Sequence, residues 1–192
     1  ATAADFVPDS DSGGRTVLLS EADYYSGALW PRYERAQRLA ESGDAKAQAR
    51  AKRLLTLINP AAWVDIQVEP RTGWLPERTL TAFAREWLRF RGFPKEEITL
   101  RRSAGRIEAL GRFASKVLEE VVLLRGYLNH DLHEFSPRRT KDEKLDEVRL
   151  RFAQELLTVW SDFIEGAPDH QAEIVATYNR LFRGFIQPAY DE

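Results

Sequence analysis

The sequence predicts a mainly α fold with a small β element (α+β), made of six to seven helices and a two- or three-stranded sheet. Apolar residues recur at helical spacing in most segments after Ser20. Proline, glycine and Asn-Pro steps separate these segments. Alternation of apolar and polar residues, which is typical of strands, is confined to two short stretches. We therefore expect helix in about 55 to 65% of residues, well above the usual third.

The first residues of the chain are small, polar and acidic, and nothing in them repeats with a helical or strand period. Residues 1–17 are therefore expected to form a flexible tail or linker. The rest of the 192-residue chain, residues 18–192, has a length that fits a single, mostly helical domain.

Three helices are expected in the first third of the chain. Ser20, followed by Asp23, can cap a short helix. A proline well suited to the first helical position opens a second helix over about 31–41. The Ala-rich segment 45–58 forms the third helix and stops at an Asn-Pro step. The last two of these helices predict a helical hairpin.

Two short segments, residues 63–69 and 98–100, have the periodicity of strands. We expect them to pair as the small sheet. Between them, Pro76 can open a helix with a single apolar stripe, and Gly92 lies just past its expected end.

Three further helices are expected in the second half of the chain. The first covers about 103–128, although two glycines weaken its start by about 1 kcal/mol each relative to alanine. A polar loop leads to a capping box of Thr140 and Glu143, which precedes the helix that contains residues 145–163. Pro168 begins the last helix.

Composition excludes several classes of protein. With 28 Lys and Arg against 30 Asp and Glu, the net charge of −2 excludes a uniformly basic nucleic-acid protein, so a polyanion would need a local patch. The absence of cysteine excludes disulfides and thiolate metal sites. No apolar run reaches the roughly 18 residues of a membrane span, and the N-terminal residues lack the zones of a signal peptide. We expect a soluble, cytoplasmic protein without a membrane partner.

The sequence lacks the motifs of nucleotide and acyl chemistry. No glycine has the spacing of a phosphate-binding P-loop, and there is no Gly-x-Ser-x-Gly elbow. We expect no cofactor and no enzymatic activity in this chain by itself. A helical turn could bring His130 together with His133 or Glu134 to bind a metal. The alternative is a polar helix end with histidine near the helix dipole, and we assign no metal site.

The segment from Arg85 to Lys116 is basic, with nine Lys and Arg against four Glu, a local balance of +5. Its central residues Arg101, Arg102 and Arg106 lie beside a predicted strand end and helix start, where cations and backbone amides could hold phosphates. The other candidate nucleic-acid-binding residues are Arg89, Arg91 and Arg112. The alternative is a solvated face whose charges are balanced by acids elsewhere.

Aromatic residues indicate a second kind of contact. Trp74 lies in a predicted loop close to Arg71, where it could stack on a base or plug the junction between sheet and helix. Together with Tyr24 and Phe185, Trp74 could also form an apolar surface that docks another domain or protein.

Several motifs occur in order along most of residues 18–192. They are Leu18-Leu19-Ser20-Glu21-Ala22-Asp23-Tyr24-Tyr25-Ser26-Gly27, then Ile58-Asn59-Pro60 with Asp65-Ile66-Gln67-Val68 and Gly73-Trp74-Leu75-Pro76, then Leu123-Leu124-Arg125-Gly126-Tyr127-Leu128-Asn129, and finally Trp160 with Tyr178-Asn179-Arg180-Leu181-Phe182 and Pro188-Ala189-Tyr190-Asp191. This order resembles the accessory region upstream of the helicase core in large Swi/Snf-type superfamily-two helicases of phages and mobile elements, some of them fused to DNA methyltransferases. The resemblance implies an accessory region of an ATP-dependent motor, with the helicase core of the same polypeptide as a partner.

Two functions stay open at this point. The first is a non-catalytic accessory domain that engages DNA through its phosphate backbone without reading its sequence. The alternative is a helical protein interaction module that docks the motor to another domain or partner. Salt separates the two, because phosphate binding weakens through counterion release while apolar docking hardly changes.

Overall fold

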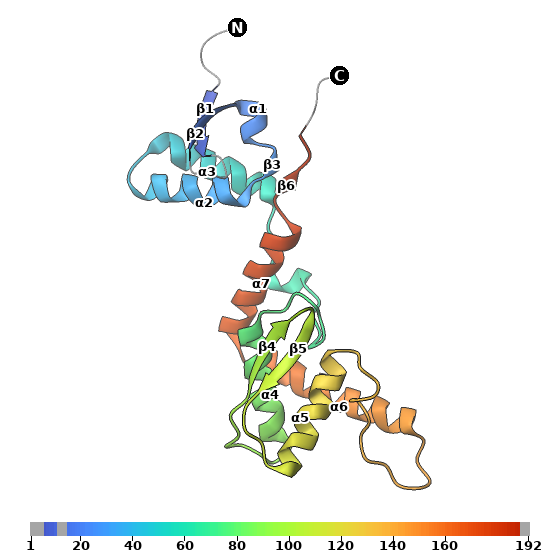
Figure 1. Ribbon diagram of the computed structural model, residues 1–192. Coiled ribbons are helices and arrows are strands. Elements are labelled where there is room, and N and C mark those ends of the chain that lie inside the picture. Colours follow the sequence, from blue (N-terminus) through green and yellow to red (C-terminus); the bar gives the residue numbers. More distant parts are fainter. Residues whose placement is uncertain (1–5, 11–14, 189–192) are drawn as a thin grey trace. The chain divides into compact units, whose positions relative to one another are not determined.

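The computed structural model describes residues 6–10 and 15–188. Within them the chain is 54% helical, with seven helices and three two-stranded antiparallel sheets, which confirms the predicted mainly helical α+β class. The chain divides into two compact units, residues 1–62 with 178–192 (unit 1) and residues 63–177 (unit 2) (Figure 1). This division differs from the single domain expected after the tail, because the first helical hairpin and the C-terminal end of the chain form a core of their own.

Unit 1 begins with an antiparallel hairpin of β1 (Phe6–Ser10) and β2 (Thr16–Ser20). Both strands overlap the predicted tail, so the description of these residues as a tail is corrected. Val7 and Asp9 are both buried. An inward aspartate departs from the usual alternation of apolar and polar residues in a half-buried strand, which is why the sequence pattern concealed β1. The tail residues that flank β1 lie outside the described residues.

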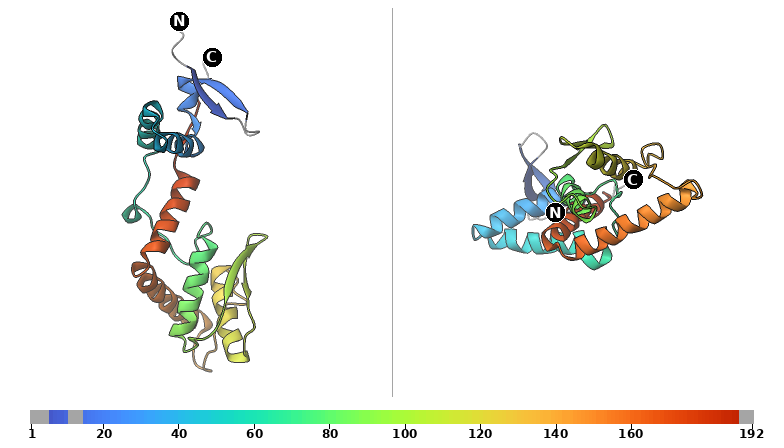
Figure 2. Two further views of the ribbon diagram at one scale, coloured as in Figure 1. Left: turned by 90° about the vertical axis from the view of Figure 1, so that its left-hand side faces the viewer. Right: turned by 90° about the horizontal axis from the view of Figure 1, so that it is seen from below.

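The helices of unit 1 form where the sequence predicts them. Helix α1 (Glu21–Tyr24) is capped by the Ser20 hydroxyl, which accepts a hydrogen bond of 3.1 Å from the backbone N–H of Asp23. Helices α2 (Trp30–Glu41) and α3 (Ala45–Ile58) form the predicted helical hairpin and lie side by side (Figure 2).

The C-terminal end of the chain joins this hairpin through backbone and side-chain hydrogen bonds. Strand β3 (Gly27–Ala28) pairs antiparallel with β6 (Phe185–Ile186). The buried amide of Asn179 accepts from the Ala61 N–H at 2.7 Å and donates to the Ala61 carbonyl at 2.9 Å. Trp30 donates its indole N–H to the Asn179 carbonyl at 2.8 Å. These contacts explain why residues far apart in sequence share one core.

Unit 2 contains a short 3-10 helix η1, four α-helices and one hairpin. The elements are η1 (Trp63–Asp65), α4 (Glu77–Phe90), β4 (Thr99–Ser103), β5 (Arg106–Leu110), α5 (Ser115–Leu128), α6 (Leu145–Glu165) and α7 (Pro168–Phe182), whose last turn belongs to unit 1. The predicted helices beginning near Pro76 and Pro168 and the helix over 145–163 are confirmed. No described helix combines the length and the hydropathy needed to cross a membrane.

The predicted strand over residues 63–69 is wrong, and so is its pairing with residues 98–100. The segment forms η1 and an extended loop, in which Val64 is 88% exposed. The loop is held by a hydrogen bond of 3.1 Å from the Trp160 indole N–H to the Val68 carbonyl. This segment of alternating apolar residues has no partner strand and instead forms a loop that packs against α6.

The predicted helix over 103–128 is correct only in its second part. Ala104 and Gly105 both have positive φ, 48° and 78°, and form the turn between β4 and β5. The apolar residues of β5 happen to lie at helical spacing from those of α5, so the sequence pattern resembles one long helix. The partner of β4 is therefore β5, in the register Arg102↔Ile107.

Side chains of neighbouring helices satisfy both edges of the β4–β5 hairpin. On the β4 edge, the Thr81 hydroxyl accepts from the Leu100 N–H at 2.9 Å, and Glu77 accepts from the Arg102 N–H at 2.7 Å. On the β5 edge, the Asn129 amide accepts from the Ile107 N–H at 2.7 Å and donates to its carbonyl at 2.9 Å. A lone two-stranded hairpin is marginal in water, so these contacts and the burial of Leu100 and Ile107 fix its position.

The predicted capping box forms only one of its two hydrogen bonds and does not cap a helix. The Glu143 carboxylate accepts from the backbone N–H and the hydroxyl of Thr140, both at 3.0 Å. The Glu143 N–H donates to the Thr140 carbonyl at 3.4 Å, and not to the Thr140 hydroxyl as in a capping box. Helix α6 begins only at Leu145, after Lys144, so the motif closes a turn immediately before the helix.

Candidate nucleic-acid interface

The geometry of the β4–β5 hairpin determines which of the predicted arginines can contact the same ligand. Successive residues of a strand point to opposite faces, and the register pairs Arg101 with Glu108 and Ser103 with Arg106. Arg101 and Arg106 thus belong to the exposed face. Arg102 belongs to the opposite face, beside the buried Leu100 and Ile107 of that face. Arg101, Arg102 and Arg106 therefore do not share one exposed face, because the consecutive strand residues Arg101 and Arg102 point to opposite faces.

Each of these three arginines has a different partner. Arg101 forms a cross-strand ion pair of 3.0 Å with Glu108, and its side chain is 56% exposed. Arg106 forms an ion pair of 2.7 Å with Asp131 and is 60% exposed. The Arg102 guanidinium donates to the Leu75 carbonyl at 3.3 Å. Among the described residues, no carboxylate lies within ion-pair distance of that guanidinium.

The remaining predicted arginines lie apart from this hairpin face. Arg89 pairs with Glu86 on the exposed side of α4 at 2.6 Å. Arg91 binds both oxygens of Glu120 at 3.0 Å and Glu155 at 3.1 Å, which ties α4 to α5 and α6. Arg112 is exposed, with no ion pair to any residue in the described part of the chain. Arg91 thus has a structural role, whereas Arg89 and Arg112 are exposed charges outside any common site.

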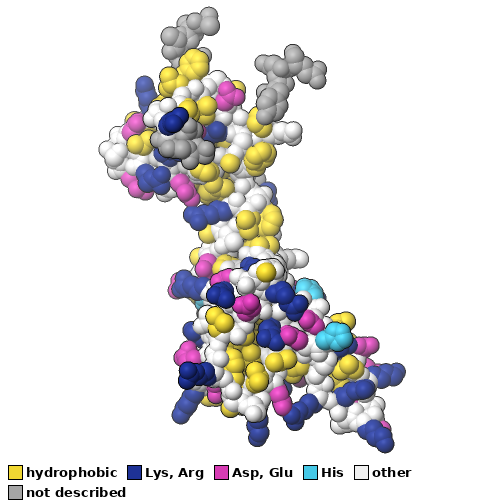
Figure 3. All heavy atoms as spheres, in the orientation of Figure 1, with side chains coloured by type: hydrophobic (Ala, Val, Ile, Leu, Met, Phe, Trp, Pro, Cys, Tyr) yellow, Lys and Arg dark blue, Asp and Glu magenta, His cyan; other side chains and the backbone are white. Residues whose placement is uncertain are grey.

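A groove of about 400 Å³ brings together residues from three segments of unit 2, two of which contribute arginines. Its polar lining residues are Arg71, Thr72, Arg102, Arg106, Asn129 and His130. No aspartate or glutamate is among its lining residues. We call this the cationic groove. Figure 3 shows how widely basic, acidic and histidine side chains are otherwise mixed on this unit, so a groove lined by arginines and by no carboxylate differs from its surroundings.

The sequence predicts two of the three groove arginines, Arg102 and Arg106, as phosphate-binding residues. It indicates Arg71 only as a neighbour of Trp74. Arg71 lies over the ring of Tyr127, 5.3 Å from its centroid, and 3.5 Å from the Glu69 carboxylate. No local signal marks Arg71, because the groove forms only where the loop after η1, the hairpin turn and the end of α5 meet.

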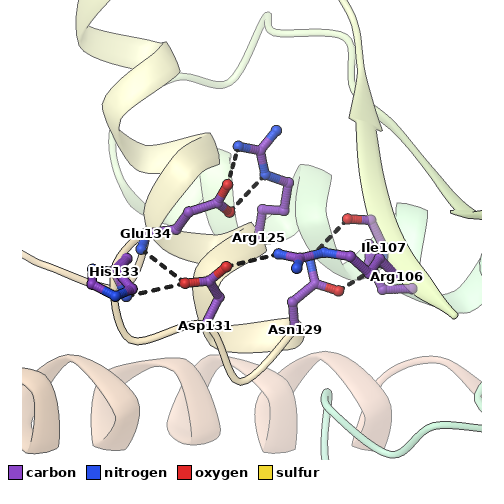
Figure 4. A network of polar contacts seen from close by, with 7 residues as sticks. All are labelled: Arg106, Ile107, Arg125, Asn129, Asp131, His133 and Glu134. Carbon is purple, nitrogen blue, oxygen red and sulfur yellow. Dashed lines mark hydrogen bonds and ion pairs between the residues drawn. The ribbon is translucent and has the colours of Figure 1, made fainter.

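The loop after α5 holds one wall of the cationic groove in place (Figure 4). Asp131 accepts from the backbone N–H groups of His133 at 3.0 Å and Glu134 at 3.3 Å with one oxygen, and from Arg106 with the other. Glu134 in turn receives two hydrogen bonds from Arg125, at 2.8 and 2.6 Å. The hydrogen bond from Arg106, followed by that from the Glu134 N–H, lowers the pKa of Asp131.

Gly126 allows this loop to pack against α5. A Cβ atom at this position would lie 2.4 Å from the Phe135 backbone nitrogen and 2.8 Å from the Glu134 Cβ. Both distances are far below van der Waals contact, so only glycine lets the loop return along the helix. Gly126 thus sets the position of Asp131 and His130 at the groove.

The histidines of this loop do not form the helical turn that would bring metal ligands together. Helix α5 ends at Leu128, and His130 has a left-handed backbone with φ of 54°. Asp131 and Glu134 are occupied by arginines and backbone N–H groups. The described residues contain no group of three or more His, Asp or Glu that could hold a metal ion.

The residues predicted for apolar docking do not form one surface. Tyr24 is 5% exposed and belongs to the core of unit 1, so its assignment to an exposed surface is wrong. Its aromatic ring packs at a right angle to Tyr25, with centroids 5.1 Å apart. Trp74 is half-buried in unit 2. Phe185 is 71% exposed on β6 and is the one large apolar side chain of the three that is open to solvent.

Comparisons with protein-family models, with curated proteins and with solved structures found no match for this chain.

Proposed function

We propose that this chain is a non-catalytic accessory domain that engages DNA by holding its phosphate backbone in the cationic groove of unit 2. The observation that carries this proposal is the convergence of Arg71, Arg102 and Arg106 on one groove whose lining contains no carboxylate. Arginine suits this role because its planar guanidinium presents several donors to phosphate oxygens. Contacts of this kind position a protein on DNA without reading bases.

The arginines at the groove rim have weak ion pairs, so that a phosphate could replace the carboxylate partner of each arginine. Arg106 is 60% exposed and Arg71 is 43% exposed, and each has a single carboxylate partner among the described residues. Exposed pairs of this kind contribute only about 0 to 1 kcal/mol. A phosphate can therefore approach these arginines without breaking a strong internal contact, whereas Arg91, with two carboxylates, would lose far more.

The resemblance to helicase accessory regions supports the biological setting of this proposal. In that setting the helicase core lies in the same polypeptide, and this domain holds DNA while the motor turns over ATP. The proposal assigns no catalytic residue and no cofactor to this chain, in keeping with the absence of nucleotide motifs from its sequence.

Paired arginine substitutions in the full chain test the groove. Arg102→Gln with Arg106→Gln removes two charges from the groove and should weaken binding to unrelated DNA sequences by about tenfold or more at low salt. The matched control is Arg101→Gln with Arg112→Gln, which removes two charges from the same segment outside the groove. Fluorescence anisotropy measures both. Equal losses in the two double variants would contradict the assignment of the groove.

One observation favours docking as a second candidate function. An open groove between α4 and α6 has an apolar lining of Phe90, Val159 and Phe163, and Phe90 is 56% exposed. Its rim carries three carboxylates, Glu86, Glu155 and Asp162, against one arginine, Arg151. Such a groove fits a partner helix with an apolar stripe and flanking Lys or Arg.

Phe90→Ser tests this second candidate. A synthetic helical peptide with leucines on one face and lysines beside them should bind the wild-type chain and lose affinity for the variant. DNA affinity should stay unchanged in Phe90→Ser, because Phe90 does not line the cationic groove. A peptide that binds both chains equally would exclude this groove as a docking site.

A further inference from the structure

An apolar pocket in unit 2 adjoins the cationic groove and shares Arg71 and His130 with it. The aromatic rings of Tyr127 and Phe135 line the pocket, with centroids 5.6 Å apart. Arg149 completes the polar part of its lining. No carboxylate is among the lining residues of this pocket either. A ligand that lies along the groove can therefore reach this apolar cavity past Arg71 and His130.

One feature of this pocket is unexplained by the fold alone. Its leucines, Leu132 and Leu150, are 61% and 60% exposed, although they lie next to an aromatic lining. The Tyr127 side chain is 3% exposed and its hydroxyl is buried, so Tyr127 contributes only part of its ring to the lining. Apolar side chains exposed together at a cavity suit contact with the apolar face of a ligand.

The pocket has a rigid frame. Arg149 donates to the Phe135 carbonyl at 2.7 Å and to the Leu132 carbonyl at 2.5 Å, which binds the loop after α5 to α6. Arg71 lies over the Tyr127 ring. A planar ligand in the pocket would thus meet an apolar wall and the guanidinium groups of two arginines.

We infer that the cationic groove and this pocket together take a single-stranded nucleic acid, with phosphates in the groove and a base in the pocket. This inference rests on the proposed function and names its substrate form. In a duplex the bases are stacked and paired, so their faces cannot enter a pocket beside the backbone. In a single strand a base can turn out of the stack and pack against apolar side chains and arginine.

The test compares three labelled probes on the full chain by fluorescence anisotropy: an oligo-dT single strand, a duplex of the same length, and a single strand with abasic sites throughout. We expect the oligo-dT strand to bind roughly tenfold more tightly than either other probe, since each stacked base contributes a factor of this order.

Substitution of the two exposed leucines tests whether this pocket causes the preference for oligo-dT. Leu132→Ser with Leu150→Ser should reduce oligo-dT affinity to that of the abasic strand and leave duplex affinity unchanged. The control is Leu110→Ser with Leu118→Ser, which changes two leucines that are 44% and 47% exposed outside the pocket. This control should bind all three probes like the wild type.

Each outcome is informative about a different claim. Equal affinity for oligo-dT, duplex and abasic strands would overturn the base pocket while leaving the phosphate groove intact. Loss of oligo-dT binding in the control pair as well as in the pocket pair would also overturn it. Failure of all three probes to bind the wild-type chain would overturn both the pocket and the proposed function.

Discussion

Two arginines, Arg32 of unit 1 and Arg106 of unit 2, have opposite surroundings. In unit 1, Arg32 is largely buried and gives its donors to Asp9 and to the carbonyls of Asp23, Tyr24 and Ser26. Burial, the largest influence, lowers the pKa of this guanidinium. In unit 2, Arg106 extends into solvent with one carboxylate partner. An arginine surrounded by many internal acceptors has a structural role, whereas an arginine with few acceptors is available to a ligand. The local charge of the sequence does not separate these two cases.

Asp9→Ala should have the largest effect, because it removes the carboxylate that pairs with both Arg32 and Arg35. Breaking a buried ion pair from one side costs about 3 to 5 kcal/mol of folding free energy. Hydrogen exchange should show lost protection in α2 and α3 and unchanged protection in α4 and α6. Glu34→Ala is the control, since Glu34 pairs with Arg180 at an exposed site. Unchanged protection in α2 would show that the Arg32 cluster is not structural.

Gly126→Ala should have the next largest effect, in unit 2. The new Cβ would press on the Phe135 backbone nitrogen, and such overpacking costs about 1 to 3 kcal/mol. Urea unfolding measures the loss. Gly166→Ala is the matched control, because a Cβ there would lie 3.5 Å from its nearest neighbour, in ordinary contact. DNA binding should weaken in Gly126→Ala only, as the loop carrying His130 is displaced.

Asp131→Asn should increase DNA affinity. The amide oxygen can still accept from the backbone N–H groups of His133 and Glu134, while the charge that neutralises Arg106 is removed. A gain of roughly threefold is expected for one carboxylate removed near a bound phosphate. Glu108→Gln frees Arg101 outside the groove and should give no gain. A purely structural role for Arg106 predicts no gain in either variant.

The smallest effect concerns acid stability. The Thr140 backbone N–H, followed by the Arg151 guanidinium, lowers the pKa of Glu143 from its ordinary 4.5 to about 2. A carboxyl with a depressed pKa stabilises the fold above its unfolded pKa and loses that contribution as pH falls through its folded pKa. Glu143→Gln should therefore reduce stability near neutral pH and flatten the loss between about pH 4.5 and pH 2. Identical acid unfolding curves would contradict this role.

Sequence periodicity predicted the helices well and the strands poorly. The segment 145–163 carries a long apolar stripe that only a helix can bury, while a first-turn proline and an Ala-rich composition indicate the helices over 31–41 and 45–58. Residues 63–69 alternate as a strand would, yet pack as a loop because no partner strand lies beside them. Strand β5 is hidden because its apolar positions continue the stripe of α5, and Gly105 and Gly111 are the signals against a continuous helix.

The candidate site was predictable only in part. The basic segment identified Arg102 and Arg106, but strand alternation separates Arg102 from Arg101, and this depends on where β4 begins. Arg71 and His130 join them through tertiary packing of loops distant in sequence. Local composition carries no information on contacts between loops that are distant in sequence. The sequence therefore predicts a phosphate site within the basic segment, whereas the groove is formed by three segments.

The salt dependence of DNA binding is the most direct test of phosphate binding in the cationic groove. Each phosphate contact contributes about 0.7 to 0.9 to the magnitude of the slope of log affinity against log salt concentration. We predict that Arg102→Gln with Arg106→Gln reduces this magnitude by roughly 1.4 to 1.8 relative to the wild type, while Arg101→Gln with Arg112→Gln reduces it much less. A wild-type slope near zero, or a slope unchanged by the groove substitutions, would contradict phosphate binding in the cationic groove.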